Sequence, residues 1–161
     1  MILRISILTV SDRSSRGERP DASGPVLSKL VRAQGWQVLQ QEIVPDEIDS
    51  IAKVFRDWSD SGQTDIILAT GGTGFAPRDV TPEATRAVVE RLTPGLDEAM
   101  RSASLKVTPH AMLSRAISGI RKRTLIVNLP GSPKGARENL QVILPGLEHA
   151  VKLLRDEDAG H

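Results

Sequence analysis

Residues 70–83 read Thr70-Gly-Gly-Thr-Gly-Phe-Ala-Pro-Arg-Asp-Val-Thr-Pro-Glu83, and this stretch decides how the chain folds. It follows the apolar segment 65–69, which is long enough to form a buried strand. It ends in Thr81-Pro-Glu83, where a Thr N-cap, a Pro at the first helical position and an early acidic residue predict the start of a helix. The order of strand, glycine-rich loop and helix indicates an α/β unit.

The loop itself has the composition of an anion-binding turn. Gly71, Gly72 and Gly74 have no Cβ, so their backbone can adopt unusual dihedral angles and approach a ligand closely. Such loops present N–H groups to phosphate. The spacing matches neither a P-loop nor G-x-G-x-x-G. A plain tight turn is the alternative, but it leaves Arg78 and Asp79, which follow directly, unexplained.

Length and composition predict one ordinary globular domain. The chain has 161 residues, of which 39% are hydrophobic and 25% charged. A net charge of +1 and 2% aromatic residues argue against a nucleic-acid-binding surface. The absence of Cys excludes disulfides, thiolate metal sites and a Cys nucleophile, and three scattered His do not make a zinc site. We expect no nucleic-acid partner.

No segment has the length and apolar composition of a membrane span. The N-terminal residues 1–6 have the pattern of a strand rather than of a signal peptide. We therefore expect a soluble, cytoplasmic protein without a membrane partner.

Strands and helices alternate along the chain. Apolar runs predict strands at 2–10, 36–44, 65–69 and 124–129. Helical spacing and start signals predict helices over 21–33, from Asp46, from Thr81, from Thr93, and over 136–154 with a break or kink at Pro145. The stretch 108–123 is less regular. We expect an α/β fold, a three-layer α/β/α domain with a mostly parallel central sheet, over residues 1–155, and a frayed, charged tail at 156–161.

Polar loops follow the four predicted strands. They lie at residues 11–12, 45–47, 71–79 and 128–134. Ligands of open α/β sheets bind beyond the carboxyl ends of the strands, so these loops predict the site. Asp46 and Asp79 supply two carboxylates suited to Mg²⁺, and Arg78 and Lys134 supply cations for phosphate. This is the equipment of phosphoryl or nucleotidyl transfer.

Each of these residues also has a purely structural interpretation. Asp46 precedes a predicted helix and could be its N-cap. Asp79 could form a salt bridge within its loop with Arg78, and Lys134 could be a solvated surface charge. Ser104 and Ser114 have no His base nearby in the sequence, and spacing alone favours helix or cap hydroxyls.

Long, ordered motifs resemble the MogA/MoaB family of molybdenum-cofactor biosynthesis proteins over residues 3–154. They are Thr70-Gly-Gly-Thr-Gly74 with Pro77-Arg-Asp-Val-Thr-Pro-Glu83, Leu113-Ser-Arg115, Asn128-Leu-Pro-Gly-Ser-Pro-Lys134, Thr9-Val-Ser-Asp12 and Val44-Pro-Asp-Glu47. Arg78-Asp-Val-Thr-Pro82 and Asn128-Leu-Pro130 resemble the MogA branch, the molybdopterin adenylyltransferases, and the G domains of gephyrin and its plant equivalents.

The resemblance implies a molybdopterin-binding fold, a homotrimer and one site per subunit. It implies that the terminal phosphate of molybdopterin attacks the α-phosphate of ATP, with Mg²⁺ as cofactor, and that pyrophosphate leaves. A downstream molybdenum-insertion protein is then a candidate partner. The apolar residues of 136–154 could supply surface for the trimer, or could only cover the sheet of their own subunit.

The resemblance also assigns residues to roles. It implies catalytic and metal-binding roles for Asp46 and Asp79. The nucleotide side falls on Gly71, Gly72, Thr73 and Gly74, and the molybdopterin side on Ser11, Ser104, Ser114, Asn128, Gly131, Ser132 and Lys134. The alternative is a non-catalytic pterin- or nucleotide-binding module, or a MoaB-type paralogue that serves as a trimeric scaffold. The retained aspartate pair favours the enzyme.

Overall fold

The computed structural model describes residues 1–157, so most of the predicted tail at 156–161 lies outside the described residues. In this part of the chain one sheet has the strand order β2-β1-β3-β6-β5-β4. The strands are β1 (Arg4–Val10), β2 (Gln37–Val44), β3 (Ile66–Thr70), β4 (Arg91–Leu92), β5 (Ser118–Arg121) and β6 (Thr124–Leu129). The first four strands in this order pair in parallel, and β5 and β4 pair antiparallel at one edge.

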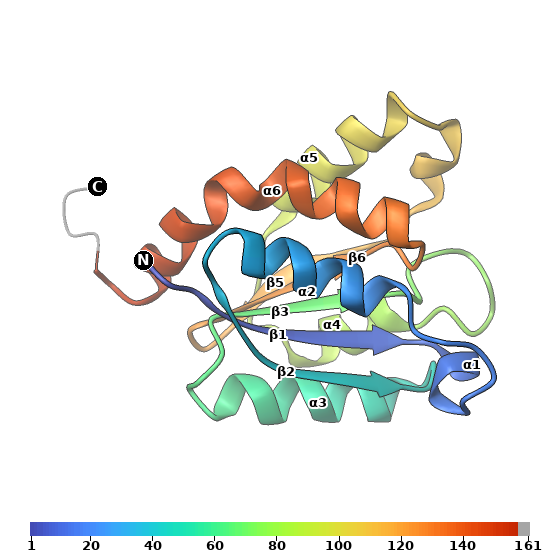
Figure 1. Cartoon of the computed structure of the whole chain (residues 1–161), viewed down its shortest axis with the longest axis horizontal. Helices are drawn as coiled ribbons and strands as arrows, with labels where there is room; N and C mark the ends of the chain where they lie inside the picture. Colours follow the sequence, from blue (N-terminus) through green and yellow to red (C-terminus); the bar gives the residue numbers. More distant parts are fainter. Residues whose placement is uncertain (158–161) are drawn as a thin grey trace.

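Helices cover both faces of the sheet (Figure 1). One layer holds α2 (Ser23–Ala33), α5 (Pro94–Leu105) and α6 (Pro133–Leu154), and the other holds α3 (Ile48–Asp60) and α4 (Thr81–Val88). A short helix, α1 (Asp12–Ser15), follows β1, and a 3₁₀ turn, η1 (Pro109–Leu113), follows α5. The predicted three-layer α/β/α fold with a mostly parallel sheet is confirmed.

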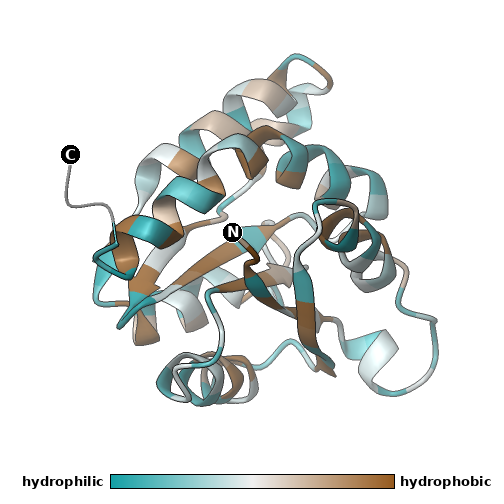
Figure 2. Ribbon diagram, turned by 60° about the vertical axis from the view of Figure 1, so that its left-hand side comes forward, coloured by the Kyte–Doolittle hydropathy of each residue, from teal (hydrophilic) through white to brown (hydrophobic). Residues whose placement is uncertain are grey.

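The period of two along each strand produces two separate cores. Ile66 and Leu68 of β3 pack with α2, α5 and α6, whereas Ile67 and Ala69 pack with α3 and α4. All four are buried because the sheet is covered on both faces. Figure 2 shows the result, with apolar strands between helices whose apolar residues alternate with polar ones.

The antiparallel edge was not predicted. β5 lies in the stretch 108–123 that the sequence left irregular, and β4 has only 2 residues. Short, partly exposed strands lack the long apolar run by which the buried strands are recognised.

Helix α6 begins earlier than predicted and continues without a break. It starts at Pro133 because the Ser132 side chain caps it, accepting a hydrogen bond from the Gly135 N–H at 3.0 Å. Pro145 lies inside the helix, so the chain has no break there, and the kink that was the other predicted outcome stays a prediction. Pro145 and Gln141, whose carbonyl loses its helical partner, are both exposed, so water can satisfy that carbonyl.

The apolar face of α6 is used within the subunit. Leu140, Ile143, Leu147 and Val151 are buried in the core on that side of the sheet. Of the two interpretations of these residues, the structure supports the one in which they cover their own sheet.

The topology places a site at one edge of the molecule. β1 lies between β2 and β3. The chain leaves β1 toward α2 on one face of the sheet and leaves β2 and β3 toward α3 and α4 on the other face, which makes a topological switch point. The carboxyl ends of the four parallel strands, at the arrowheads in Figure 1, therefore bring their loops together.

Candidate functional site

The glycine loop makes its turn through two residues with left-handed backbone. Gly71 has φ 106° and Gly72 has φ 68°. A Cβ on Gly71 would clash with the carbonyl oxygen of Val10, so the loop packs against the end of β1. Thr81 donates its hydroxyl to the Gly71 carbonyl at 2.8 Å. The predicted Thr N-cap is therefore wrong, because Thr81 is the first residue of α4 and closes the loop instead.

Asp46 and Asp12 hold the ends of β2 and β1 together. The Asp12 N–H donates to Asp46 Oδ2 at 2.8 Å, and the Asp46 N–H donates to Asp12 Oδ1 at 3.0 Å. Arg78 donates two hydrogen bonds to the Asp12 carboxylate, at 2.9 and 2.8 Å. Asp46 therefore does not cap α3, whose N-cap is Glu47, and Arg78 pairs with Asp12 rather than with Asp79.

The charges at this edge affect one another. Burial raises the pKa of Asp46 above its ordinary value, and the negative charges of Asp12 and Asp79 add to that rise. The hydrogen bonds from Arg78 hold the pKa of Asp12 below its ordinary value. Asp79 accepts a hydrogen bond from the Ala76 N–H at 3.0 Å through Oδ2. A cation beside Asp46 and Asp79 would relieve the repulsion between them.

Asp46 and Asp79 line one cavity of about 640 Å³. Its walls also contain the predicted residues Ser11, Gly71, Gly72, Gly131 and Ser132. Six further polar wall residues were not predicted as site residues, namely Thr9, Ser14, Arg19, Asp21, Ser23 and Thr70. The cavity lies where the ends of β1, β2, β3 and β6 converge.

A second cavity, of about 290 Å³, lies on the other side of the glycine loop. The predicted residues in its walls are Thr73, Gly74, Ser104, Ser114 and Ser132. Ser132 lines both cavities, so the two adjoin at the amino end of α6. The Ser104 hydroxyl accepts a hydrogen bond from Asn139 at 3.1 Å, and the Ser114 hydroxyl accepts one from the Ala116 N–H at 3.3 Å.

Two predicted site residues line neither cavity. Asn128 is fully buried and donates to Thr85 Oγ1 at 2.9 Å, because the period of β6 turns its side chain toward α4. Lys134 is exposed on α6, with its ammonium 3.9 Å from Glu138 Oε1. The structure does not bring these two side chains to the converging strand ends.

The loop after β1 contributes more than the sequence indicated. Asp21 accepts hydrogen bonds from the Thr9 hydroxyl at 2.8 Å and from the Gly24 N–H at 3.0 Å, which ties the start of α2 to the end of β1. The available signal was the density of polar residues over 11–21, directly after a strand end. Composition alone did not separate cavity residues such as Arg19 from solvated ones.

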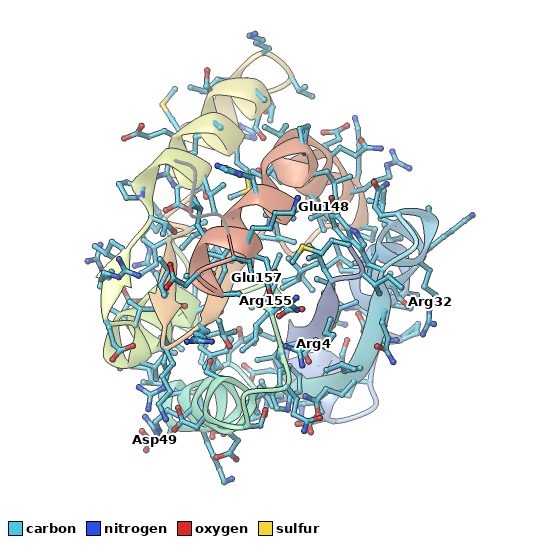
Figure 3. The ribbon with its side chains drawn as sticks, turned by 90° about the vertical axis from the view of Figure 1, so that its left-hand side faces the viewer. Arg4, Arg32, Asp49, Glu148, Arg155 and Glu157 are labelled. Carbon is cyan, nitrogen blue, oxygen red and sulfur yellow. The ribbon has the colours of Figure 1, made fainter. Side chains whose placement is uncertain are left out.

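A larger cavity, of about 780 Å³, lies at the opposite edge, at the amino ends of the strands. Arg4 and Arg155, both labelled in Figure 3, donate hydrogen bonds to the buried Asp65, which lies in the wall of this cavity. Burial acts to raise the pKa of Asp65, but these hydrogen bonds outweigh it and hold the pKa below its ordinary value. This cluster ties the last residues of the described chain to the sheet, which is a structural role. The two cavities at the carboxyl ends of the strands are therefore the candidate site.

The site has no preformed cage for a metal ion. Within residues 1–157, no group of three or more His, Cys, Asp or Glu side chains could hold one. A metal at Asp46 and Asp79 would therefore share its coordination with substrate oxygens, as Mg²⁺ commonly does. Among the same residues, no helix is long and apolar enough to cross a membrane.

Comparison with known proteins points to one family. Residues 6–149 match the model of a family described as "Probable molybdopterin binding domain". The chain is 43% identical over 154 residues to a molybdopterin adenylyltransferase of Helicobacter pylori strain J99, covering 94% of this chain and 88% of that protein. It is 45% identical over 163 residues to gephyrin of Dictyostelium discoideum, covering 95% of this chain but only 23% of gephyrin.

A solved structure shows the same fold over its whole length. It is the molybdopterin biosynthesis enzyme MoaB of Thermus thermophilus, to which this chain is 51% identical with a TM-score of 0.91. The match covers 96% of this chain and 98% of that one.

Proposed function

We propose that this chain, which belongs to the family of probable molybdopterin binding domains, is a molybdopterin adenylyltransferase. It transfers AMP from ATP to the terminal phosphate of molybdopterin and releases pyrophosphate, a late step of molybdenum cofactor biosynthesis. The proposal rests on one observation above all: Asp46 and Asp79 line a cavity that adjoins a second cavity at Ser132. Two neighbouring cavities suit a reaction that joins two substrates.

ATP occupies the cavity of about 640 Å³ that Asp46 and Asp79 line, so this proposal places Ser11 and Gly131 on the nucleotide side and not on the molybdopterin side that the resemblance implied. Thr73 and Gly74, which the resemblance placed on the nucleotide side, line the smaller cavity.

The walls of the ATP cavity contain the backbone of Gly71 and Gly72 and the amino end of α6 at Gly131 and Ser132. The dipole and the N–H groups at the amino end of a helix favour phosphate at such a position. Molybdopterin occupies the smaller cavity beside Ser104 and Ser114, with its phosphate directed toward Ser132.

Mg²⁺ is the proposed cofactor, held by Asp46 and Asp79 together with phosphate oxygens. Among the described residues, neither Asp46 Oδ1 nor Asp79 Oδ1 accepts a hydrogen bond, so both oxygens are available for a cation. When bound, Mg²⁺ supplies neutralisation of the phosphate charges. The protein aligns the two phosphates, and a terminal phosphate is already largely ionised near neutral pH, so no strong base is needed.

The proposal extends to assembly and location. Residues 1–155 form the catalytic domain of a cytoplasmic homotrimer that passes its product to a molybdenum-insertion protein. Exposed apolar side chains at the end of α5 and in η1 support the trimer: Leu105, Val107, Met112 and Leu113. Light scattering that finds only monomer at micromolar concentration contradicts this assembly.

The alternative is a non-catalytic pterin- or nucleotide-binding module, or a MoaB-type trimeric scaffold. The 51% identity to a protein named MoaB is the observation in its favour. A scaffold, however, has no use for two unpaired carboxylate oxygens on one cavity.

Incubation with molybdopterin, ATP and Mg²⁺ tests the proposal. We expect adenylylated molybdopterin and pyrophosphate from the wild type. Asp79→Asn should slow turnover by about 10²-fold or more and still bind pterin. Asp49→Asn is the matched control, because Asp49 is an exposed aspartate of α3 outside both cavities. Pterin binding by the wild type without any product supports the scaffold instead.

A further inference from the structure

The guanidinium of Arg115 joins both ends of the loop that carries Asp79. Its Nε donates to the Gly74 carbonyl and its Nη2 donates to the Asp79 carbonyl, each at 2.7 Å. The backbone N–H of Arg115 also donates to the Thr73 carbonyl at 2.8 Å. One residue thus ties together the first and last peptide groups of the loop 74–79.

Glu83 holds this guanidinium from the other side. Its two carboxylate oxygens accept hydrogen bonds from Arg115 at 2.8 and 3.2 Å. The Arg115 side chain is 34% exposed, and its planar group fits three partners that lie in different directions. Lysine cannot replace it, because one ammonium on a flexible stem cannot span two carbonyls and a carboxylate in this arrangement.

The loop has little other support. Residues 75–78 are exposed, and Phe75 is 68% exposed. Within the loop, the hydrogen bonds join only Ala76 and Asp79, and Arg78 reaches outward to Asp12. The direction of the Asp79 carboxylate therefore depends on the backbone that Arg115 holds.

Arg115 lines neither cavity, although its neighbours do. Ser114, Thr73 and Gly74 are in the wall of the smaller cavity, and Asp79 is in the wall of the larger one. A group in this position acts on a reaction through the residues that it holds, not by touching substrate.

We propose that Arg115 is a positioning residue that keeps Asp79 in place beside Asp46 by holding both ends of the loop 74–79. The role of Asp79 in this statement rests on the proposed function. The hydrogen bonds of Arg115 do not, so its effect on the loop can be measured without any activity.

The experiment compares Arg115→Lys with Arg121→Lys and the wild type. Arg121 is the matched control because it too donates to a carboxylate and a carbonyl, those of Asp60 and Val88, outside both cavities. We expect Arg115→Lys to lower kcat about ten-fold or more and to raise the Mg²⁺ concentration for half-maximal rate several-fold. KM for molybdopterin should stay within about two-fold, because Arg115 touches no substrate. Arg121→Lys should keep wild-type values for all three.

Amide hydrogen exchange gives the reading that is independent of activity. We expect amides of 74–80 to exchange about ten-fold faster in Arg115→Lys, with unchanged exchange in the central strands. Unchanged exchange in the loop, or an equal loss of kcat in Arg121→Lys, overturns the proposal. A wild type that forms no product refutes the proposed function alone, since the exchange comparison still decides whether Arg115 holds the loop.

Discussion

Replacing Asp46 by Asn should make the protein more stable and less active. Its carboxylate is partly buried and carries a raised pKa, because burial and the charges of Asp12 and Asp79 all disfavour ionisation. Asn keeps the size of the side chain, and its amide oxygen can still accept the hydrogen bond from the Asp12 N–H. The substitution therefore removes a repulsive charge and little else.

The magnitude follows from the surroundings of Asp46. Interactions between partly exposed charges contribute about 0.2–1 kcal/mol each, and two negative neighbours act here. We expect the free energy of unfolding to rise by roughly 0.5–1.5 kcal/mol at pH 7, or about 1–5 °C in Tm for a chain of this size. AMP transfer should fall by about 10²-fold or more, because one of the two carboxylates proposed to hold Mg²⁺ is lost.

The pH dependence of this gain has a definite sign. An aspartate has an ordinary pKa of 3.8, and the folded protein raises that of Asp46. The folded state therefore binds the proton more tightly than the unfolded state, and the wild type loses stability as pH rises from 3.8 through the raised pKa. The advantage of Asp46→Asn should be full above that window and should vanish below it, where the wild-type carboxyl is also neutral.

The test compares the wild type with Asp46→Asn. It measures the Tm of both proteins without ligand between about pH 3.5 and 8, and AMP transfer at pH 7. Asp49→Asn serves as control, since Asp49 is exposed and its loss should leave stability within about 0.5 kcal/mol. The reasoning is refuted if Asp46→Asn has a lower Tm than the wild type at pH 7, or if its gain in stability does not change with pH.

Gly71→Ala should lower the free energy of unfolding in urea by roughly 1–3 kcal/mol or more, because of backbone strain at φ 106° and the clash with the end of β1. The control Gly95→Ala should be tolerated, because Gly95 faces open space on α5. Equal losses in the two variants would show that the loop adapts. Asp65→Asn should lower the free energy of unfolding by about 3 kcal/mol at pH 7, because two arginines lose their shared carboxylate. Since the pKa of Asp65 is lowered in the folded protein, this contribution is fully present above pH 3.8 and disappears as pH falls through the lowered pKa. The difference in free energy of unfolding between the wild type and Asp65→Asn should therefore be smaller at about pH 2.5 than at pH 7, as measured by chemical unfolding. Ser114→Ala should weaken molybdopterin binding about ten-fold with ATP binding unchanged, and equal pterin affinity in equilibrium binding would remove Ser114 from that site.

Much of the fold was predictable because its signals are local. The apolar run 65–69, the glycines after it and the helix start after those lie close together in the chain. The same run-and-loop pattern at the other strand ends predicted the edge of the sheet at which the site lies. The short strands β4 and β5 escaped prediction because they are partly exposed and carry no such run.

The candidate site was predictable only in part. Asp46 and Asp79 follow β2 and β3, the two strands that flank β1, so their presence on one cavity follows from topology, while their catalytic roles stay predictions. Asn128 lies in an equally suggestive motif, yet its side chain faces α4, because that face of β6 meets Thr85. Arg115 stands in a short motif whose partners, Gly74 and Asp79, are 41 and 36 residues away in the chain.

The sequence by itself therefore determined the layers, the mostly parallel character of the sheet and the edge that carries the loops, since period, turn residues and strand-to-helix alternation act over short distances. Only the tertiary structure decided which polar groups pair with one another. The bond between Arg78 and Asp12 joins residues 66 apart, and it leaves Asp79 without the partner that adjacency suggested. A hydrogen bond depends on direction and on contact in space, and neither is encoded in the distance along the chain.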